Sequence, residues 1–395
     1  MREILNINKG WKFSKGASSV PSKLPDDWQD VDLPYTWNGD DGQDGGNDYY
    51  RGKGYFAKIL TKDKMPQGDE IYIQLDGVNS TAEVYFNGKK LCEHNGGYSA
   101  FRVKLDDIKD ENLLVVTADN SPNDYVYPQV ADFTFYGGIY RDVKLIGVSK
   151  NHFDLDFYGS TSFAVTPVIS GNDAKITLDA YCDGEVEFEI DDGNEVVAKA
   201  KVSGKNPSAV LEIKDVHLWD GVDDPFLYNA SAKLIVDGQV ADEVKSRFGC
   251  RTFEIDAQKG FILNGRPYPL RGVSRHQDRP HIGNALLPEH HKEDMDLICE
   301  MGANTIRLAH YQHAQYFYDL CDERGIIVWA EIPYISKHLE KGVENTISQM
   351  KELIFQNYNH PSIVVWGVSN EITISTKDNG NKCLTNPIMN RYWNQ

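Results

Sequence analysis

The sequence predicts a multidomain protein in which two β-sandwiches precede about half of a parallel (β/α)8 barrel of the TIM-barrel type. Short segments of alternating hydrophobicity fill residues 1–149, and a second all-β pattern fills 150–252. From residue 253 to 395, hydrophobic runs alternate with helical patterns. A chain of 395 residues is also long enough for several hydrophobic cores. We therefore expect three domains with these boundaries.

The first region has the pattern of a jelly-roll sandwich. Apolar and polar residues alternate with period two, and Gly, Asn and Asp separate the segments, as expected for antiparallel strands. Asn87-Gly88 predicts a tight hairpin turn, because both residues accept positive φ angles. Examples are YFAKIL (55–60), EIYIQLDG (70–77), AEVYFNGKKL (82–91) and RDVKLIGV (141–148).

The second region is predicted to be an immunoglobulin-like sandwich. Its roughly 100 residues suit that domain, and the strand-like segments follow one another at sandwich-like spacing. No Gly/Ser-rich linker separates it from the first region, so the two domains are expected to pack directly on each other. The segments include KITLDAYCD (175–183), EVEFEI (185–190) and YNASAKLIVDG (228–238).

The third region has the pattern of a parallel sheet covered by helices. Continuous apolar runs are typical of strands buried on both faces, and the intervening helical patterns indicate βαβ units. Gly302 and Gly325 are expected to end two helices in the left-handed conformation. Four units form half of an eight-stranded barrel, so we expect the rest of the barrel beyond residue 395. The runs are PLRGVSRH (269–276), NTIRLAHY (304–311), IIVWAEIP (326–333) and SIVVWGVSNE (362–371).

Polar residues follow all four predicted barrel strands. One strand-end carboxylate or histidine is more often a helix cap, half of an ion pair or a hydrogen-bonded structural group. Catalytic groups of such barrels, however, lie at the carboxyl ends of the strands, and four consecutive polar ends favour an active site. The residues are Arg275 and His276, Arg307 and His310, Glu331, and Asn370 with Glu371.

Glu371 and Asn370 suit the hydrolysis of a glycoside. A retaining glycosidase needs one carboxylic acid to protonate the leaving oxygen and a second carboxylate about 5–5.5 Å away as nucleophile. Glu371 can be the acid, and Asn370 can hold a sugar hydroxyl. Only Asp378 follows as a further carboxylate, without a predicted strand to present it, so the nucleophile is expected beyond the last residue. We therefore expect residues 1–395 alone to have little or no hydrolytic activity.

Four segments resemble glycoside hydrolase family 2, in that family's order. DFTFYGGIYRDVKLI (132–146) resembles the end of its sugar-binding jelly roll, and HPSIVVWGVSNE (360–371) resembles its acid/base signature. Two further segments resemble its first three barrel strands, FILNGRPYPLRGVSRHQDRP (261–280) and NTIRLAHYQHAQYFYDLCDERGIIVWAE (304–331).

The resemblance implies roles for individual residues. Glu371 takes the general acid/base position, and Asn370 takes the position that contacts the sugar 2-hydroxyl. His276 and His310 fall on two histidines that line the sugar subsite. Arg307 is expected to bind substrate because of its position at a strand end. Asp132 falls on a jelly-roll acid that reaches the barrel mouth and binds hydroxyls of the terminal sugar.

The resemblance also implies a substrate class. Three short motifs are most similar to those of bacterial β-galactosidases: AHYQH (309–313), WAEIP (329–333) and SNEI (369–372). This similarity implies hydrolysis of terminal, non-reducing β-D-galactosides. A β-glucuronidase of the same family is the alternative. A protein that binds carbohydrate without catalysis is the alternative from another class, although half a barrel would expose unpaired strand edges.

No metal or cofactor is expected. Ile335 and Lys337 stand where the large magnesium-dependent β-galactosidases have a Glu and a His, and a hard cation needs oxygen ligands. His310 and His313 have a spacing that suits zinc, but no third ligand is evident.

Composition narrows the partners and the compartment. A formal charge of −18 disfavours binding to nucleic acid or to an anionic membrane. The six cysteines are spread without pairs, which favours reduced thiols. No signal-peptide pattern opens the sequence, so we expect the cytoplasm, or the periplasm or outside if a leader has been removed. The protein could also form a homo-oligomer, which the sequence does not decide.

Overall fold

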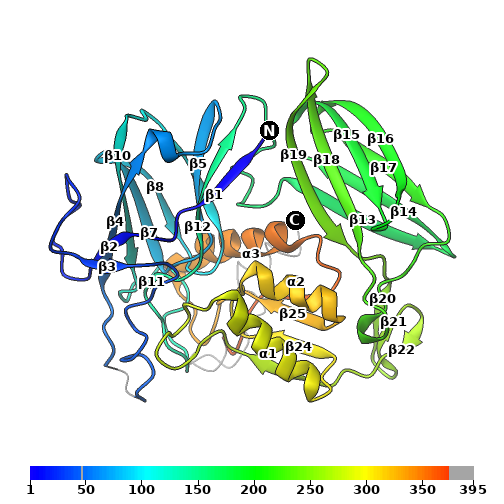
Figure 1. Ribbon diagram of the computed structural model, residues 1–395. Helices are drawn as coiled ribbons and strands as arrows, with labels where there is room; N and C mark the ends of the chain where they lie inside the picture. The colour runs from blue at the N-terminus through cyan, green and yellow to red at the C-terminus, as the bar shows by residue number, and fades with distance from the viewer. Residues whose placement is uncertain (46–47, 373–395) are drawn as a thin grey trace.

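A computed structural model describes residues 1–45 and 48–372. Two β-sandwiches lie side by side, and a layer of parallel strands and helices packs against both of them (Figure 1). The first sandwich is blue to cyan, the second is green, and the parallel layer is yellow to orange. The arrangement confirms the predicted fold class, since antiparallel ladders form both sandwiches and parallel ladders form the third region.

The first sandwich has a six-stranded sheet in the order β3-β2-β4-β10-β7-β8 and a four-stranded sheet in the order β1-β12-β5-β9. Its core lies between them, where Trp11, Phe56 and Ile73 are fully buried. Asn87 and Gly88 have φ angles of 51° and 82° and join β7 to β8 in the predicted hairpin. The strands are β1 (Glu3–Asn6), β2 (Trp11–Ser14), β3 (Gln29–Val31), β4 (Lys53–Thr61), β5 (Glu70–Leu75), β6 (Val78–Asn79), β7 (Thr81–Phe86), β8 (Lys89–Asn95), β9 (Phe101–Leu105), β10 (Glu111–Asp119), β11 (Gly138–Ile139) and β12 (Val143–Val148).

The second sandwich packs a three-stranded sheet, β13-β14-β17, on a four-stranded sheet, β16-β15-β18-β19. Alternate residues of β15 and β18 face its core, among them Phe188 and Leu234. The alternating pattern of this region therefore follows from one buried and one solvated face. The strands are β13 (Phe163–Ser170), β14 (Asp173–Ala180), β15 (Asp183–Asp191), β16 (Val196–Lys205), β17 (Ser208–Ile213), β18 (Tyr228–Val236) and β19 (Gln239–Phe248).

The third region begins with a small antiparallel sheet that the sequence analysis did not predict, β20 (Phe253–Asp256), β21 (Gly260–Leu263) and β22 (Arg266–Pro267). A parallel sheet in the order β23-β24-β25-β26 follows. Gly302 and Gly325 have φ angles of 78° and 69° after α1 and α2, as predicted for left-handed helix ends. The elements are β23 (Gly272–Arg275), α1 (Pro288–Glu300), β24 (Thr305–Leu308), α2 (Gln315–Arg324), β25 (Ile327–Glu331), α3 (Val343–Asn357) and β26 (Ile363–Gly367). Single 3-10 turns are η1 (Lys62–Lys64), η2 (Gly221–Asp223) and η3 (Glu340–Gly342).

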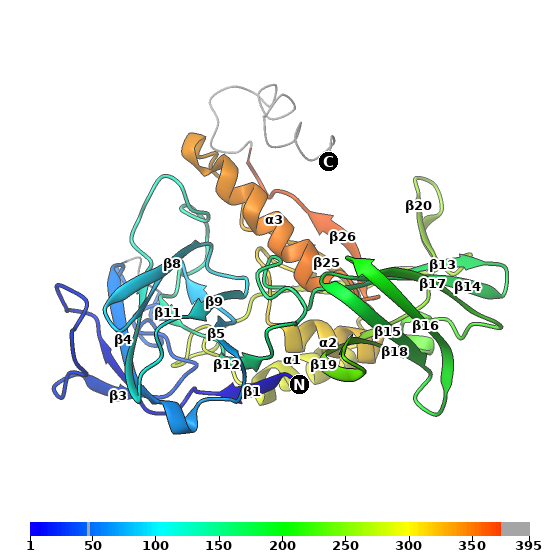
Figure 2. The same ribbon diagram turned by 90° about the horizontal axis from the view of Figure 1, so that it is seen from above.

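Side chains join the three regions directly. Seen from above, α3 runs between the first sandwich and the parallel sheet (Figure 2). There the Asn345 amide donates to the Asn95 carbonyl at 2.7 Å. Arg2 of the first sandwich pairs with Asp242 of the second at 2.8 Å, and the Trp219 indole donates to the Asp322 carbonyl on α2 at 2.9 Å. These contacts join the first sandwich to α3 and to the second sandwich, and they join the second sandwich to α2.

The cysteines and the helices of the described residues bear on two further expectations. Their five cysteines are free thiols, and Cys383 lies outside the described part. In the same residues, no helix combines the length and the apolar composition that a membrane crossing requires.

Candidate active site

Arg307 joins three of the four strand ends. Its guanidinium donates to both carboxylate oxygens of Glu331, through Nε to Oε1 and through Nη2 to Oε2 at 3.1 Å. Nη2 also donates to Asn370 Oδ1 at 2.7 Å. His310 Nδ1 lies 3.0 Å from Glu331 Oε2. Glu331 therefore binds the predicted residues Arg307 and His310, and Arg307 in turn binds Asn370.

Glu331 is the buried centre of this network, with 2% of its side chain exposed. Burial alone would raise its pKa, but hydrogen bonds from His310 and Arg307 outweigh that effect and hold the pKa below its ordinary value. The carboxylate fits because Gly367 is its register partner on β26, where a Cβ atom would come within 2.7 Å of Glu331 Cγ. Glu331 is thus an ionised anchor rather than a free catalytic acid.

His276 lies beside His310, with the two ring centroids 5.4 Å apart. Its Nδ1 contacts the Tyr311 hydroxyl at 3.1 Å. Burial is the main reason that its pKa is lowered, and the nearby His310 lowers it further. At neutral pH the His276 ring is therefore uncharged.

The first sandwich contributes an aromatic wall to these histidines. The Phe133 ring centroid lies 5.1 Å from that of His276, 6.0 Å from that of His310 and 5.3 Å from that of Tyr311. Tyr98, from the loop after β8, stacks on Tyr311 at 4.4 Å. Two domains therefore build one site, and the sequence analysis missed both Phe133 and Tyr311. Their positions directly after Asp132 and His310 were the only available signal.

Asp132 comes directly before Phe133 and is exposed. Its carboxylate is close enough to His276 to act on the pKa of that ring, which it raises against the larger effect of burial. The structure therefore brings Asp132 toward the histidines from the other domain. Its proposed contact with sugar hydroxyls stays a prediction.

Asn370 and Glu371 follow β26 and are held through the backbone of Asn370. The Asn370 amide donates to the Tyr334 carbonyl at 2.9 Å, and the Ser336 amide donates to the Asn370 carbonyl at 3.0 Å. Glu371 is exposed and has a φ angle of 53°, in the left-handed region. Its carboxyl group is thus accessible to a ligand at the carboxyl end of the sheet. Asp378 lies outside the described residues.

Arg275 does not belong to this set, which corrects the expectation drawn from its strand-end position. It pairs in register with Leu308, whose side chain is fully buried on the helix side of the sheet. Its guanidinium instead binds Asp294 of α1, from Nε at 2.9 Å, and contacts His313 Nδ1 at 3.0 Å.

The same contacts argue against zinc at His310 and His313. His313 is fully buried, and its Nε2 contacts the Ala309 carbonyl at 3.2 Å while Nδ1 faces Arg275. Both ring nitrogens of His313 are therefore used inside the protein.

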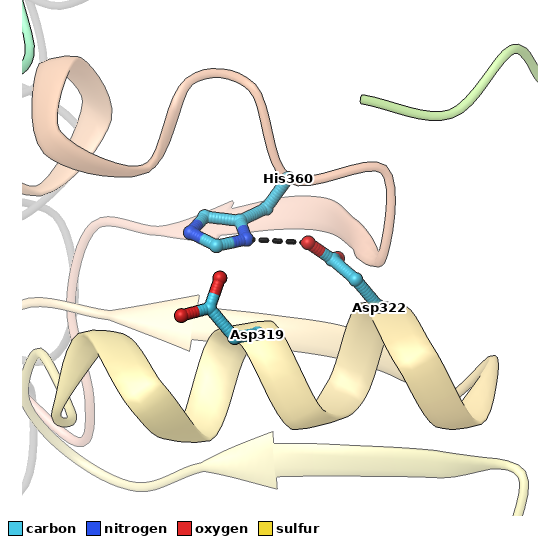
Figure 3. Close-up of side chains that lie close together, drawn as sticks. All are labelled: Asp319, Asp322 and His360. Atoms are coloured by element: carbon cyan, nitrogen blue, oxygen red, sulfur yellow. Dashed lines mark hydrogen bonds and ion pairs between the residues drawn. The ribbon is translucent and has the colours of Figure 1, made fainter. Parts of the chain in front are cut away.

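A separate group of possible metal ligands binds other side chains of the protein and so has a structural role. Asp319, Asp322 and His360 place ligand atoms within 4.8 Å of one another (Figure 3). His360 Nδ1 lies 2.6 Å from Asp322 Oδ2, and Arg247 of the second sandwich pairs with Asp319 at 3.3 Å. Burial lowers the pKa of His360, but the Asp322 carboxylate outweighs it and raises the pKa above its ordinary value. His360 and Arg247 thus each contact one of the two carboxylates and tie α2 to its neighbours.

A cleft of about 800 Å³ opens between the three domains, but none of the predicted site residues lines it. Its walls carry both signs of charge, such as Arg102 and Lys144 beside Asp76 and Asp319. The cleft therefore separates the domains, whereas the predicted site residues lie at the carboxyl ends of the parallel strands.

Sequence models of three domains of glycosyl hydrolases family 2 match nearly the whole chain. The sugar-binding domain matches residues 5–149, the general family 2 domain matches 160–251, and the TIM-barrel domain matches 253–385.

Relatives of known name match over the same range. The chain is 40% identical to a β-glucuronidase of Bacteroides fragilis, over 94% of this chain and 56% of that protein. It is 30% identical to a β-galactosidase of Thermoanaerobacter pseudethanolicus, over 93% of this chain and 51% of that protein. The chain thus spans about half the length of the curated relatives it matches.

A solved structure is similar in both sequence and shape. The crystal structure of an FMN-binding β-glucuronidase from Faecalibacterium prausnitzii L2-6 superposes with a TM-score of 0.90 at 40% identity. The match covers 96% of this chain and 60% of that one.

Proposed function

Because the chain belongs to glycosyl hydrolases family 2, we propose that it supplies the sugar-binding half of the active site of a retaining β-glycosidase that acts on β-D-glucuronides. In this proposal Glu371 is the general acid/base and Asn370 holds a sugar hydroxyl. His276, His310 and Asp132 bind the terminal sugar. The nucleophilic carboxylate comes from outside the described residues.

The observation that carries the chemistry is the geometry of the strand ends. Asn370 is locked by its backbone and by Arg307, so Glu371 is presented beside an oriented amide. The histidine rings stand at the same end of the sheet, under an aromatic wall from the first sandwich. Glycoside hydrolysis needs this combination of a proton donor and fixed partners for hydroxyls.

The choice of glucuronide over galactoside rests on the relatives. The relative with 40% identity carries the name β-glucuronidase, and the β-galactosidase has 30% identity. The short motifs AHYQH and SNEI favoured galactosides, but they cover few positions, whereas the identity extends over most of the chain. A β-galactosidase is therefore the second candidate.

Steady-state kinetics of the enzyme with a complete barrel test the substrate. We expect kcat/KM for 4-nitrophenyl β-D-glucuronide to exceed that for the β-D-galactoside by at least about tenfold, because one charge-assisted hydrogen bond to the carboxylate stabilises by about 1.5–3 kcal/mol. The reverse order would support the galactosidase candidate. Binding of both sugars without turnover would support a non-catalytic carbohydrate-binding protein.

A further inference from the structure

Among residues 1–45 and 48–372, the hydroxyl of Tyr311 has one acceptor available for its proton, His276 Nδ1. Tyr311 is 5% exposed, so its hydroxyl is removed from solvent. The Gln277 backbone amide donates to this oxygen at 3.4 Å, and His276 Nδ1 lies 3.1 Å from it. A buried hydroxyl needs an acceptor, and His276 Nδ1 is the acceptor that the described part of the chain provides. The Tyr311 proton therefore points to Nδ1, which must carry a lone pair.

This contact fixes the tautomer of His276. A neutral imidazole that accepts at Nδ1 carries its proton on Nε2. Burial and the neighbouring His310 keep the ring neutral by lowering its pKa, and Arg307 acts in the same direction. Asp278 and Asp132 oppose them without reversing the shift. His276 thus offers a hydrogen-bond donor, Nε2–H, as its remaining polar atom.

His310 has the opposite arrangement. Its Nδ1 lies 3.0 Å from Glu331 Oε2, and an ionised carboxylate can only accept. Arg307 Nη2 also lies 3.2 Å from His310 Nδ1, but its two protons already have closer acceptors at Asn370 Oδ1 and Glu331 Oε2, at 2.7 and 3.1 Å. Nδ1 of His310 therefore carries a proton, and in the neutral form of the ring Nε2 is left as an acceptor.

We propose that Tyr311 is a positioning residue that sets His276 in the tautomer opposite to that of His310, so that the two rings offer one donor and one acceptor side by side to the hydroxyls of the terminal sugar. The proposal rests on the proposed function for its ligand class. A hydroxyl both donates and accepts, so a donor–acceptor pair holds it in one orientation. Phe133 packs over both rings and limits their rotation.

Nuclear magnetic resonance of protein labelled with 15N-histidine tests the tautomers without substrate. We expect His276 to show a protonated Nε2 and a bare Nδ1, and His310 to show the reverse. The variants His276→Gln and His310→Gln each remove one set of signals and so assign them. A protonated Nδ1 at His276 in the unmodified protein would overturn the proposal, whatever the enzyme hydrolyses.

Tyr311→Phe tests the positioning role, with Tyr98→Phe as its matched control. Each change removes one hydroxyl from one of two stacked rings, but only Tyr311 contacts His276. Tyr311→Phe should give mixed His276 tautomers and lower kcat/KM of the complete enzyme about 3- to 10-fold, the effect of one neutral hydrogen bond. Tyr98→Phe should leave the His276 signals unchanged. An unchanged His276 pattern in folded Tyr311→Phe would contradict the proposal, and if that variant fails to fold, the unmodified protein still decides it.

Discussion

Removing Arg307 should destabilise the barrel region more than removing the charge of its partner. Arg307→Met leaves the Glu331 carboxylate, 2% exposed, with His310 as its remaining side-chain donor among the described residues. Breaking a buried ion pair from one side costs about 3–5 kcal/mol. The Arg307 side chain is 35% exposed, so water already screens part of the pair and the cost falls to the lower end of this range or slightly below it. We expect a loss of about 2–3 kcal/mol in the free energy of unfolding.

Glu331→Gln is the matched control, because it keeps the shape of the side chain and removes the buried charge. It leaves Arg307 unpaired but partly solvated, so we expect a smaller loss of about 1 kcal/mol. The double variant should then resemble Glu331→Gln alone, since no buried charge is left without a partner. The cycle should give a coupling energy of about 2–3 kcal/mol.

Urea denaturation followed by the helical circular dichroism signal is the suitable assay. Within residues 1–45 and 48–372, all α-helices lie between Pro288 and Asn357, so this signal reports on the barrel region rather than on the sandwiches. Single-variant losses that add within about 0.5 kcal/mol in the double variant would refute the coupling. So would an Arg307→Met protein as stable as the unmodified one.

Three further predictions follow from the same contacts. The pKa of Glu331 is lowered on folding, so its contribution to stability is complete above the ordinary value of 4.5 and fades as the pH falls below it; Glu331→Gln should flatten this acid-side loss in urea titrations. The pKa of His360 is raised on folding, so its pairing with Asp322 should stabilise the fold fully below pH 6.5 and less as the pH rises through the pKa of His360 in the folded protein. If the free energy of unfolding of His360→Gln still depended on pH in this range as in the unmodified protein, the prediction would be wrong. Gly367→Ala should cost about 1–3 kcal/mol by crowding, whereas Gly16→Ala, with open space around it, should be neutral in the same assay.

The sequence predicted the elements well where local chemistry decides the structure. Asn87-Gly88 can turn tightly in any context, and Gly302 and Gly325 can end helices because they adopt positive φ without strain. The apolar runs also identified the barrel strands, although in the structure one face of β24 is buried and the other is only partly buried, and Trp329 of β25 is 46% exposed. The small sheet β20-β21-β22 was not predicted, because its strands have two to four residues and their apolar and polar residues alternate only weakly.

The roles of side chains at strand ends depended on register, which the sequence does not reveal. Arg275 and Arg307 both close a predicted strand, but Arg275 aligns with Leu308 while Arg307 aligns with Trp329. A shift of one residue turns a side chain to the other face of the sheet. One arginine is therefore buried beside α1, and the other orients Asn370 and Glu331.

The contribution of the first sandwich could not be derived from local pattern. Asp132 was assigned only through family resemblance, and Phe133 and Tyr98 were not singled out at all. Their contacts with His276 and Tyr311 join residues more than 140 positions apart, which only the packing of domains can reveal.

The role of Glu371 is the central claim, and the leaving-group dependence of Glu371→Gln tests it most directly. In the complete enzyme, the variant should lose most activity on glucuronides whose leaving group needs a proton, such as an alkyl alcohol. It should lose much less on 4-nitrophenyl β-D-glucuronide, whose phenolate departs without one. Equal losses on both substrates would contradict the assignment of Glu371 as the general acid.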